Sequence, residues 1–282
     1  MASNFVKHLA TVALVAFAAA PLAAQELPSD PSKLSDAELR KALMIDPLVT
    51  GTVSQPFFRG APGTSSGSPS GFGAGWRDGF VGGGYQQVRG GGQADGSIAG
   101  GFGLGNAKDA VGLEVVVASL STFRSGLFDR TAFSFKAHHM VSSSASIAIG
   151  VENAFIAGGG ETDGASSVFA VASKQMNLGE GAGFLAGKSL TMSGGVGNGR
   201  FRFEKDALAD KKTINFFGSV GVQVHEKASV FADWGGQDLT LGLSFVPIKE
   251  FPIILTPAIA DVTGRNGNDP RFTMGFGIGM RF

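Results

Sequence analysis

Large apolar side chains alternate with small or polar ones along most of the chain, and the alternation is clearest at the C-terminus. The segment FTMGFGIGMRF has a large apolar residue at every even position from Phe272 to Phe282. Successive side chains of a strand point to opposite faces, so one face here is apolar and the other carries Thr, Gly and Arg. A strand of a soluble β-sandwich rarely combines such large residues on one face with almost no side chains on the other.

The same alternation recurs beyond Trp76 and predicts about twelve strands of the ~9–11 residues that a tilted transmembrane strand needs. The expected strands lie near 77–88, 97–104, 112–117, 133–135, 147–152, 166–176, 188–196, 214–224, 228–234, 238–245, 253–260 and 272–282. An even number suits a barrel whose two ends emerge on one side. We therefore predict an all-β fold, a transmembrane antiparallel β-barrel over residues 76–282.

Three short hairpins support this fold, because their loop lengths keep the apolar residues of both strands on one face. One has a two-residue Gly-Gly loop, which favours positive φ, and the others have loops at 225–227 and 106–109. The predicted pairs flanking these loops are Trp234 with Gln237, Val224 with Ala228, and Gly105 with Ala110.

The connections between strands also tend to alternate in length. Bacterial barrels place short turns in the periplasm and long loops outside. The long connections expected outside lie near 119–130, 156–165, 198–212 and 261–271, and the short ones lie at 106–109, 139–144 and 225–227. The tight Gly235-Gly236 hairpin is the exception, and it is expected on the outside.

Residues 1–24 are predicted to be a secretory signal peptide. Lys7 precedes an apolar run from Leu9 to Ala20, and small residues end at Ala24. The run is shorter than the ~20 apolar residues of a spanning helix, which argues against a membrane anchor.

Residues 25–75 differ in composition from the strands that follow. Ser35 and Glu38 have the spacing of a capping box, and they predict a short helix over about 35–45. A stretch rich in Gly, Ser and Pro comes next and predicts a flexible linker. We expect a periplasmic helix and linker, and the alternative is a plug that occupies the barrel lumen.

Composition removes several function classes. The chain has 23 Lys and Arg against 23 Asp and Glu, with no basic tract, so it lacks the charge pattern of a nucleic-acid binder. It has 44 Gly in no collagen-like period, as expected for many short strands and turns. It has no Cys, which leaves no disulfide framework and no thiolate metal site.

Taken together, the signal peptide, the alternating strands over about 77–282 and the last strand resemble Gram-negative outer-membrane β-barrel proteins. In that family, a C-terminal Phe preceded by apolar residues at alternate positions is the signal that the barrel-assembly machinery reads. The residues that match it are Met274, Phe276, Ile278, Met280 and Phe282, with Met280 where a tyrosine is common. The stretches ADWGGQDLTLG and TPAIADVTG are also similar to uncharacterised predicted envelope proteins. The resemblance implies an outer-membrane location and contact with outer-membrane lipid.

Three charged residues are predicted to point into the lumen near mid-height. Glu114, Lys136 and Glu152 lie on consecutive predicted strands, and we expect them to be cross-strand neighbours. Such a lumen ion cluster either screens solutes as a charged constriction or simply neutralises itself, because charges within a membrane domain need partners.

The remaining candidates for chemistry are weak. Asp233 and Asp238 are expected to oppose each other across the glycine hairpin as two solvated carboxylates or a weak cation site, with too few oxygens for calcium. His138 and His139 are adjacent, but no serine nucleophile motif accompanies them. We predict no catalytic residue, no metal and no cofactor.

The function expected from the sequence is a passive diffusion pore for small solutes. The alternative is a non-conducting structural or surface-interaction barrel, resembling an adhesin or receptor, whose lumen is plugged. The sequence leaves the solute and the oligomeric state open.

Overall fold

The computed structural model describes residues 63–87, 94–120, 122, 126–158, 166–178, 188–203, 205–206, 209, 211–248, 251, 253–264 and 270–282. They all belong to one compact unit, Asp46–Phe282. The predicted signal peptide and the predicted helix over 35–45 lie outside the described residues.

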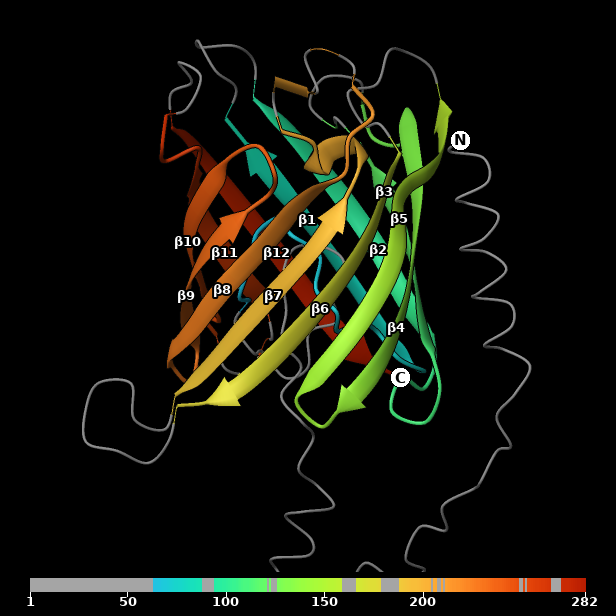
Figure 1. Cartoon of the computed structure of the whole chain (residues 1–282), viewed down its shortest axis with the longest axis vertical. Coiled ribbons are helices and arrows are strands. Elements are labelled where there is room, and N and C mark those ends of the chain that lie inside the picture. The colour runs from blue at the N-terminus through green and yellow to red at the C-terminus, as the bar shows by residue number, and fades with distance from the viewer. Residues whose placement is uncertain are drawn as a thin grey trace, which may run out of the picture. The chain divides into compact units, whose positions relative to one another are not determined.

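Twelve strands form a closed antiparallel barrel in which each strand pairs with its neighbours in sequence, and the last pairs with the first (Figure 1). The strands are β1 (Asp78–Gln86), β2 (Asp95–Gly105), β3 (Gly112–Ser119), β4 (Arg130–Ser142), β5 (Ala145–Gly158), β6 (Ser167–Asn177), β7 (Ser189–Gly197), β8 (Asn215–His225), β9 (Ala228–Trp234), β10 (Leu239–Phe245), β11 (Ile253–Ala260) and β12 (Arg271–Arg281). A short 3-10 helix, η3 (Gly199–Phe201), follows β7. The predicted fold class and the twelve predicted strands are confirmed.

Connections alternate between the two ends of the barrel. One end, which we call the turn end, has the short connections at 106–111, 143–144 and 226–227 and the longer ones at 178–188 and 246–252. The other, the loop end at the top of Figure 1, has those at 87–94, 120–129, 159–166, 198–214, 235–238 and 261–270. The glycine hairpin between β9 and β10 also lies at the loop end, as predicted.

Two of the three predicted hairpin registers are wrong by two residues. Trp234 pairs with Leu239, and the loop between them has four residues, with Gly236 at φ +98°. Gly105 pairs with Gly112. In the third hairpin, Val222 pairs with Val230, which is the register predicted from the pairing of Val224 with Ala228. A shift of two residues keeps every side chain on its face, so the predicted faces survive.

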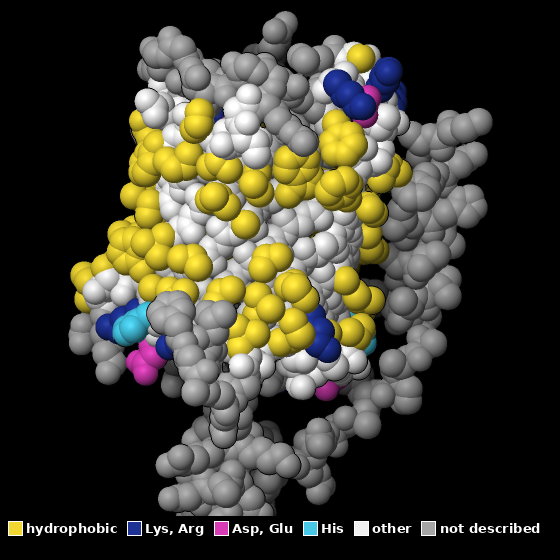
Figure 2. Space-filling model, turned by 60° about the vertical axis from the view of Figure 1, so that its left-hand side comes forward, with side chains coloured by type: hydrophobic (Ala, Val, Ile, Leu, Met, Phe, Trp, Pro, Cys, Tyr) yellow, Lys and Arg dark blue, Asp and Glu magenta, His cyan; other side chains and the backbone are white. Residues whose placement is uncertain are grey.

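Apolar side chains cover the outside of the barrel. On β12, the exposed fraction is 43% for Phe276 and 52% for Met280. On the face that Figure 2 shows, such side chains gather in two bands across the barrel, with a paler zone between them. Among the described residues, no helix is long and apolar enough to span a bilayer.

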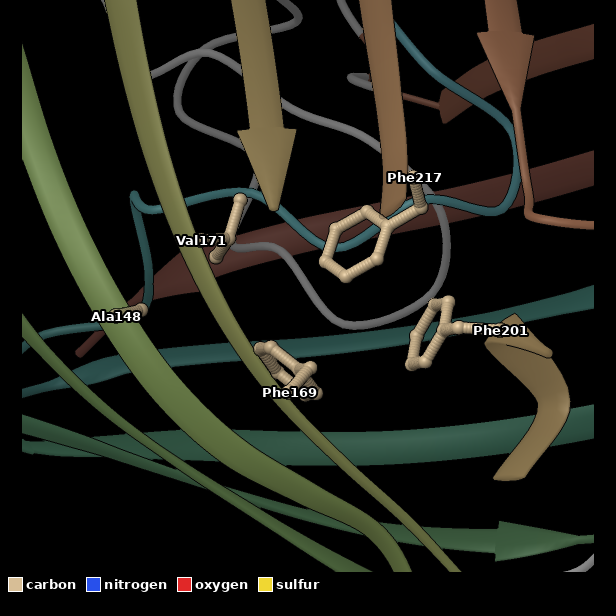
Figure 3. Close-up of a cluster of buried hydrophobic side chains, with 5 residues drawn as sticks. All are labelled: Ala148, Phe169, Val171, Phe201 and Phe217. Atoms are coloured by element: carbon tan, nitrogen blue, oxygen red, sulfur yellow. The ribbon is translucent and has the colours of Figure 1, made fainter. Parts of the chain in front are cut away.

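Small hydroxyl side chains and three apolar clusters fill much of the inside. The buried inward serines are Ser146, Ser167, Ser173, Ser219, Ser229 and Ser244. In one cluster, Phe201 of η3 stacks on Phe217 with ring centroids 4.3 Å apart, and Phe169 meets both rings edge-on (Figure 3). A second cluster joins Phe80 to Ala74, which precedes β1, and a third joins Val246 to Ile254.

The C-terminal aromatic residue provides a test of assembly. Phe282 is 64% exposed and its backbone N–H donates to Arg77 O at 3.1 Å. A charge near the membrane interface costs a folded barrel only about 0–1 kcal/mol. We therefore expect Phe282→Asp to refold in detergent but to fail to insert in cells, as judged by heat-modifiable gel migration. Phe128→Asp, at another exposed aromatic residue in a loop, is the control, and normal insertion of the Phe282 variant would contradict the predicted signal.

Candidate functional site in the lumen

Residues 63–75, which we call the inner segment, lie inside the barrel. The segment exchanges hydrogen bonds with side chains of seven strands. These partners are Asp78 of β1, Glu114 of β3, His138 of β4, Ser146 of β5, Ser173 of β6, Ser229 and Asp233 of β9, and Ser244 of β10. For residues 63–75, the prediction of a periplasmic linker is therefore wrong, and the alternative prediction, a segment within the lumen, applies.

Asp233 holds the middle of the inner segment. Its carboxylate accepts the backbone N–H groups of Ser66 and Gly67, both at 2.7 Å, and of Ser68 at 3.0 Å. The Ser68 hydroxyl donates to the same carboxylate. Successive backbone N–H groups that converge on one anion form a concave site that suits a carboxylate, and hydrogen bonds to a charged acceptor are stronger than neutral ones.

Glu114 and His138 hold the end of the segment that leads into β1. Glu114 accepts the Ala74 N–H at 2.9 Å and forms an ion pair with Lys136 at 3.1 Å. The His138 Nε2–H donates to Ala74 O at 2.9 Å. Glu114 and Lys136 are directly opposite residues of β3 and β4, as predicted, and both are buried.

Serine hydroxyls hold the stretches between these points. Ser173 Oγ accepts the Gly71 N–H at 2.8 Å, and Ser146 donates to Gly71 O at 2.6 Å. The backbone comes so close to the wall that a Cβ added at Gly71 would lie 2.3 Å from Ser146 O. The glycines and serines that predicted a flexible linker therefore also suit close packing against the barrel wall.

Glu152 does not join the ion pair, so the predicted cluster of three charges is wrong. Lys136 lies opposite Gly150, and an irregularity between Phe133 and Phe135 changes the register at this point. Glu152 instead binds Arg200 of η3, with Nη2 to Oε1 at 2.8 Å. Desolvation lowers the pKa of Arg200, but the carboxylates of Glu152 and Asp233 together outweigh it and raise that pKa, which favours the charged guanidinium.

The predicted pairing of Asp233 with Asp238 is also wrong. Asp233 lies opposite Thr240, because the hairpin loop has four residues. Asp238 binds Arg271 at 2.6 Å. Each of the two carboxylates has its own partner, so Asp233 and Asp238 do not form a shared cation site.

A cavity of about 730 Å³ lies in the lumen beside the inner segment. Its walls are mostly backbone and small side chains of β1, β2, β10, β11 and β12. At the loop end, it is lined by the ion pairs of Arg200 and Arg271. It extends from this mouth to Ile254, Gly277 and Gly63.

Neither histidine is placed for catalysis. His138 is bonded to the inner segment, and His139 Nδ1 meets the carbonyl of Ala110. No three His, Asp or Glu side chains gather as a metal site within the described part of the chain.

Sequence reasoning missed the roles of Arg200 and of the Ser66–Ser68 turn. Arg200 also donates to Gly67 O at 2.7 Å, so it joins η3 to the inner segment and to β5. One feature of the sequence could have indicated that this segment packs inside the barrel. Small hydroxyl residues are abundant both in the segment predicted as a linker and on the inward face of the strands.

No protein-family model and no curated protein matches this sequence. Among solved structures, the KdgM porin in complex with disordered oligogalacturonate is similar at a TM-score of 0.41 and 10% identity, over 72% of this chain and 99% of that one. OprB of Pseudomonas putida, in a low-pH structure, is similar at a TM-score of 0.24 and 10% identity, over 72% and 91% of the two chains. The barrel described above rests on the strand pairing of this chain alone.

We expect that substitution of Asp233 loosens the inner segment from the barrel wall. Asp233→Ala leaves the N–H groups of Ser66–Ser68 without their acceptor, at a cost of at least about 1 kcal/mol. We expect amide exchange of these residues to speed up about fivefold or more, as measured by hydrogen–deuterium exchange. Asp238→Ala, at a carboxylate bonded to Arg271, is the matched control. Equal protection in both variants would show that Asp233 does not hold the segment.

Proposed function

We propose that the protein is an outer-membrane channel whose lumen is closed by its own inner segment. The observation that supports this most directly is the path of residues 63–75 along the lumen wall, with hydrogen bonds from Gly63 to Ala74. The apolar outer surface and the even-numbered closed barrel support a membrane location.

The residues around the segment explain why the described state is closed. Ala74 and Phe80 form an apolar cluster on one side, and the ion pair of Glu114 with Lys136 lies next to it. The cavity of about 730 Å³ is open among the loop-end charges and is bounded by the inner segment. A small solute enters this cavity from outside, and its further passage requires that the segment move.

The charges of the cavity set little preference for one sign of solute. Its lining carries three arginines and three aspartates, which are Arg130, Arg200, Arg271, Asp95, Asp233 and Asp238. Arg200 and Arg271 are each paired with a carboxylate, and Asp233 is bonded to the segment. We infer selection by size and polarity rather than by net charge. Catalysis has no support in this geometry, because the ionisable side chains of the lumen described above are each engaged with the wall or with the segment.

A reversible lock tests the proposal. Ser70 Oγ and Ser173 Oγ are 3.2 Å apart, and the chain has no Cys, so Ser70→Cys with Ser173→Cys creates one engineered disulfide. In planar bilayers, we expect the oxidised variant to be silent, reductant to restore the activity of the unlocked protein, and a chain lacking residues 25–75 to give the largest open steps. Ser70→Cys alone, treated with the same oxidant, is the control.

Two results would contradict the proposed function. If the locked barrel conducts as well as the truncated one, the segment does not close the path and the protein is an open pore. If the truncated barrel folds, as judged by heat-modifiable migration, and is still silent, the non-conducting barrel is the correct alternative.

A further inference from the structure

A groove of about 780 Å³ crosses the outer surface of the barrel from β5 to β9. Strand register places its floor in one row, in which Ala172 pairs with Gly194 and Gly194 with Gly218. Larger exposed side chains border this row, among them Ile147, Met192, Val196, Phe216 and Val220. The groove exists because β6, β7 and β8 have Ala or Gly in this row, while large side chains flank Gly194 on β7 and Gly218 on β8.

The groove faces lipid, so in a membrane it is filled by hydrocarbon. Its floor of small residues spans β6 to β8, between Ile147 on β5 and Trp234 on β9, so two strand spacings of about 4.8 Å give it a length of roughly 10 Å, enough for part of one acyl chain. The strands tilt by about 35–45°, so this row rises about 6 Å along the membrane normal. That rise fits within one leaflet, since half of the hydrocarbon core is about 15 Å thick. A single acyl chain matches this shape.

A positively charged side chain lies at the turn-end side of the groove. Lys174 lines it and is exposed on the outer face, opposite Met192 and three residues before β6 ends at the turn end. On the neighbouring strand, its paired residue is Ala145. A lysine at this height extends its ammonium group to the polar interface, where anionic headgroups lie.

We propose that this groove binds one anionic phospholipid, with an acyl chain on the Ala172, Gly194 and Gly218 floor and the headgroup phosphate on the Lys174 ammonium. The lipid comes from the leaflet at the turn end, which is the periplasmic leaflet if short turns face the periplasm. Hydrocarbon gains no hydrophobic energy on leaving other lipid. The preference therefore comes from the fit of the chain to the glycine floor and from the charge of Lys174.

Gly194 offers a clean test of the floor. A Cβ added there meets no atom within 4 Å, so Gly194→Leu fills the groove without disturbing the barrel. Gly100 on β2 is the matched control, because its added Cβ makes only ordinary contacts, at 3.6 Å or more. The protein is reconstituted in nanodiscs of phosphatidylglycerol and phosphatidylethanolamine, released, and weighed by native mass spectrometry.

We expect the unmodified protein and Gly100→Leu to retain one phosphatidylglycerol molecule, and Gly194→Leu to lose it. Lys174→Gln should keep a lipid but reduce the preference for phosphatidylglycerol about fivefold, since one basic residue near the interface contributes about 1 kcal/mol. Lys227→Gln, at the turn between β8 and β9, is the charge control.

Equal lipid retention in Gly194→Leu and Gly100→Leu would overturn the proposal. A dimer that Gly194→Leu dissociates would overturn it too, because the groove would then be the contact between two copies of this chain. Because the readout is bound mass in a folded barrel, it is independent of whether the lumen conducts.

Discussion

The carboxylate of Asp233 joins the barrel wall to the chain that crosses the lumen. It accepts three consecutive backbone N–H groups and one hydroxyl at the middle of the inner segment. A loop within the lumen would otherwise leave backbone donors without partners, which is costly away from water. Asp233 is 2% exposed, and its own burial is tolerated only because the segment satisfies it. Wall and segment therefore depend on each other.

This mutual dependence accounts for the composition of the lumen. The wall presents Ser and Gly because the segment must approach closely and still find hydrogen-bond partners, as Gly71 does between Ser146 and Ser173. The side of the lumen that the segment does not fill holds the cavity of about 730 Å³. One element thus divides the barrel into a filled part and an unfilled part, and the proposed function follows from that division.

The sequence predicted the fold well because strand alternation is a local pattern. All twelve strands and their outward-facing sides follow from a period of two, and so does the shared inward face of Glu114 and Lys136. The same period cannot distinguish registers that differ by two residues. For this reason the sequence-based prediction wrongly pairs Trp234 with Gln237 and wrongly places Asp238 opposite Asp233. The Glu152 error has another cause, an irregularity in the β4–β5 ladder together with an arginine contributed by a loop.

The inner segment lay beyond sequence reasoning for a physical reason. Gly and Ser are abundant in flexible linkers and equally suited to close packing against a hydroxyl-lined wall, so composition alone supports both. Only the positions of partners such as Asp233, 165 residues away from Ser68, decide between them. The choice between linker and plug is therefore made by tertiary contacts.

The division of the lumen is tested most directly by thiol accessibility in the full-length barrel, because the chain has no Cys of its own. Ser97→Cys places a thiol on the cavity wall, and Ser173→Cys places one behind the inner segment. With a membrane-impermeant maleimide added from outside, we predict rapid labelling at 97, and protection at 173 that is lost when residues 25–75 are removed. Equally rapid labelling of both positions in the full-length protein would contradict the account.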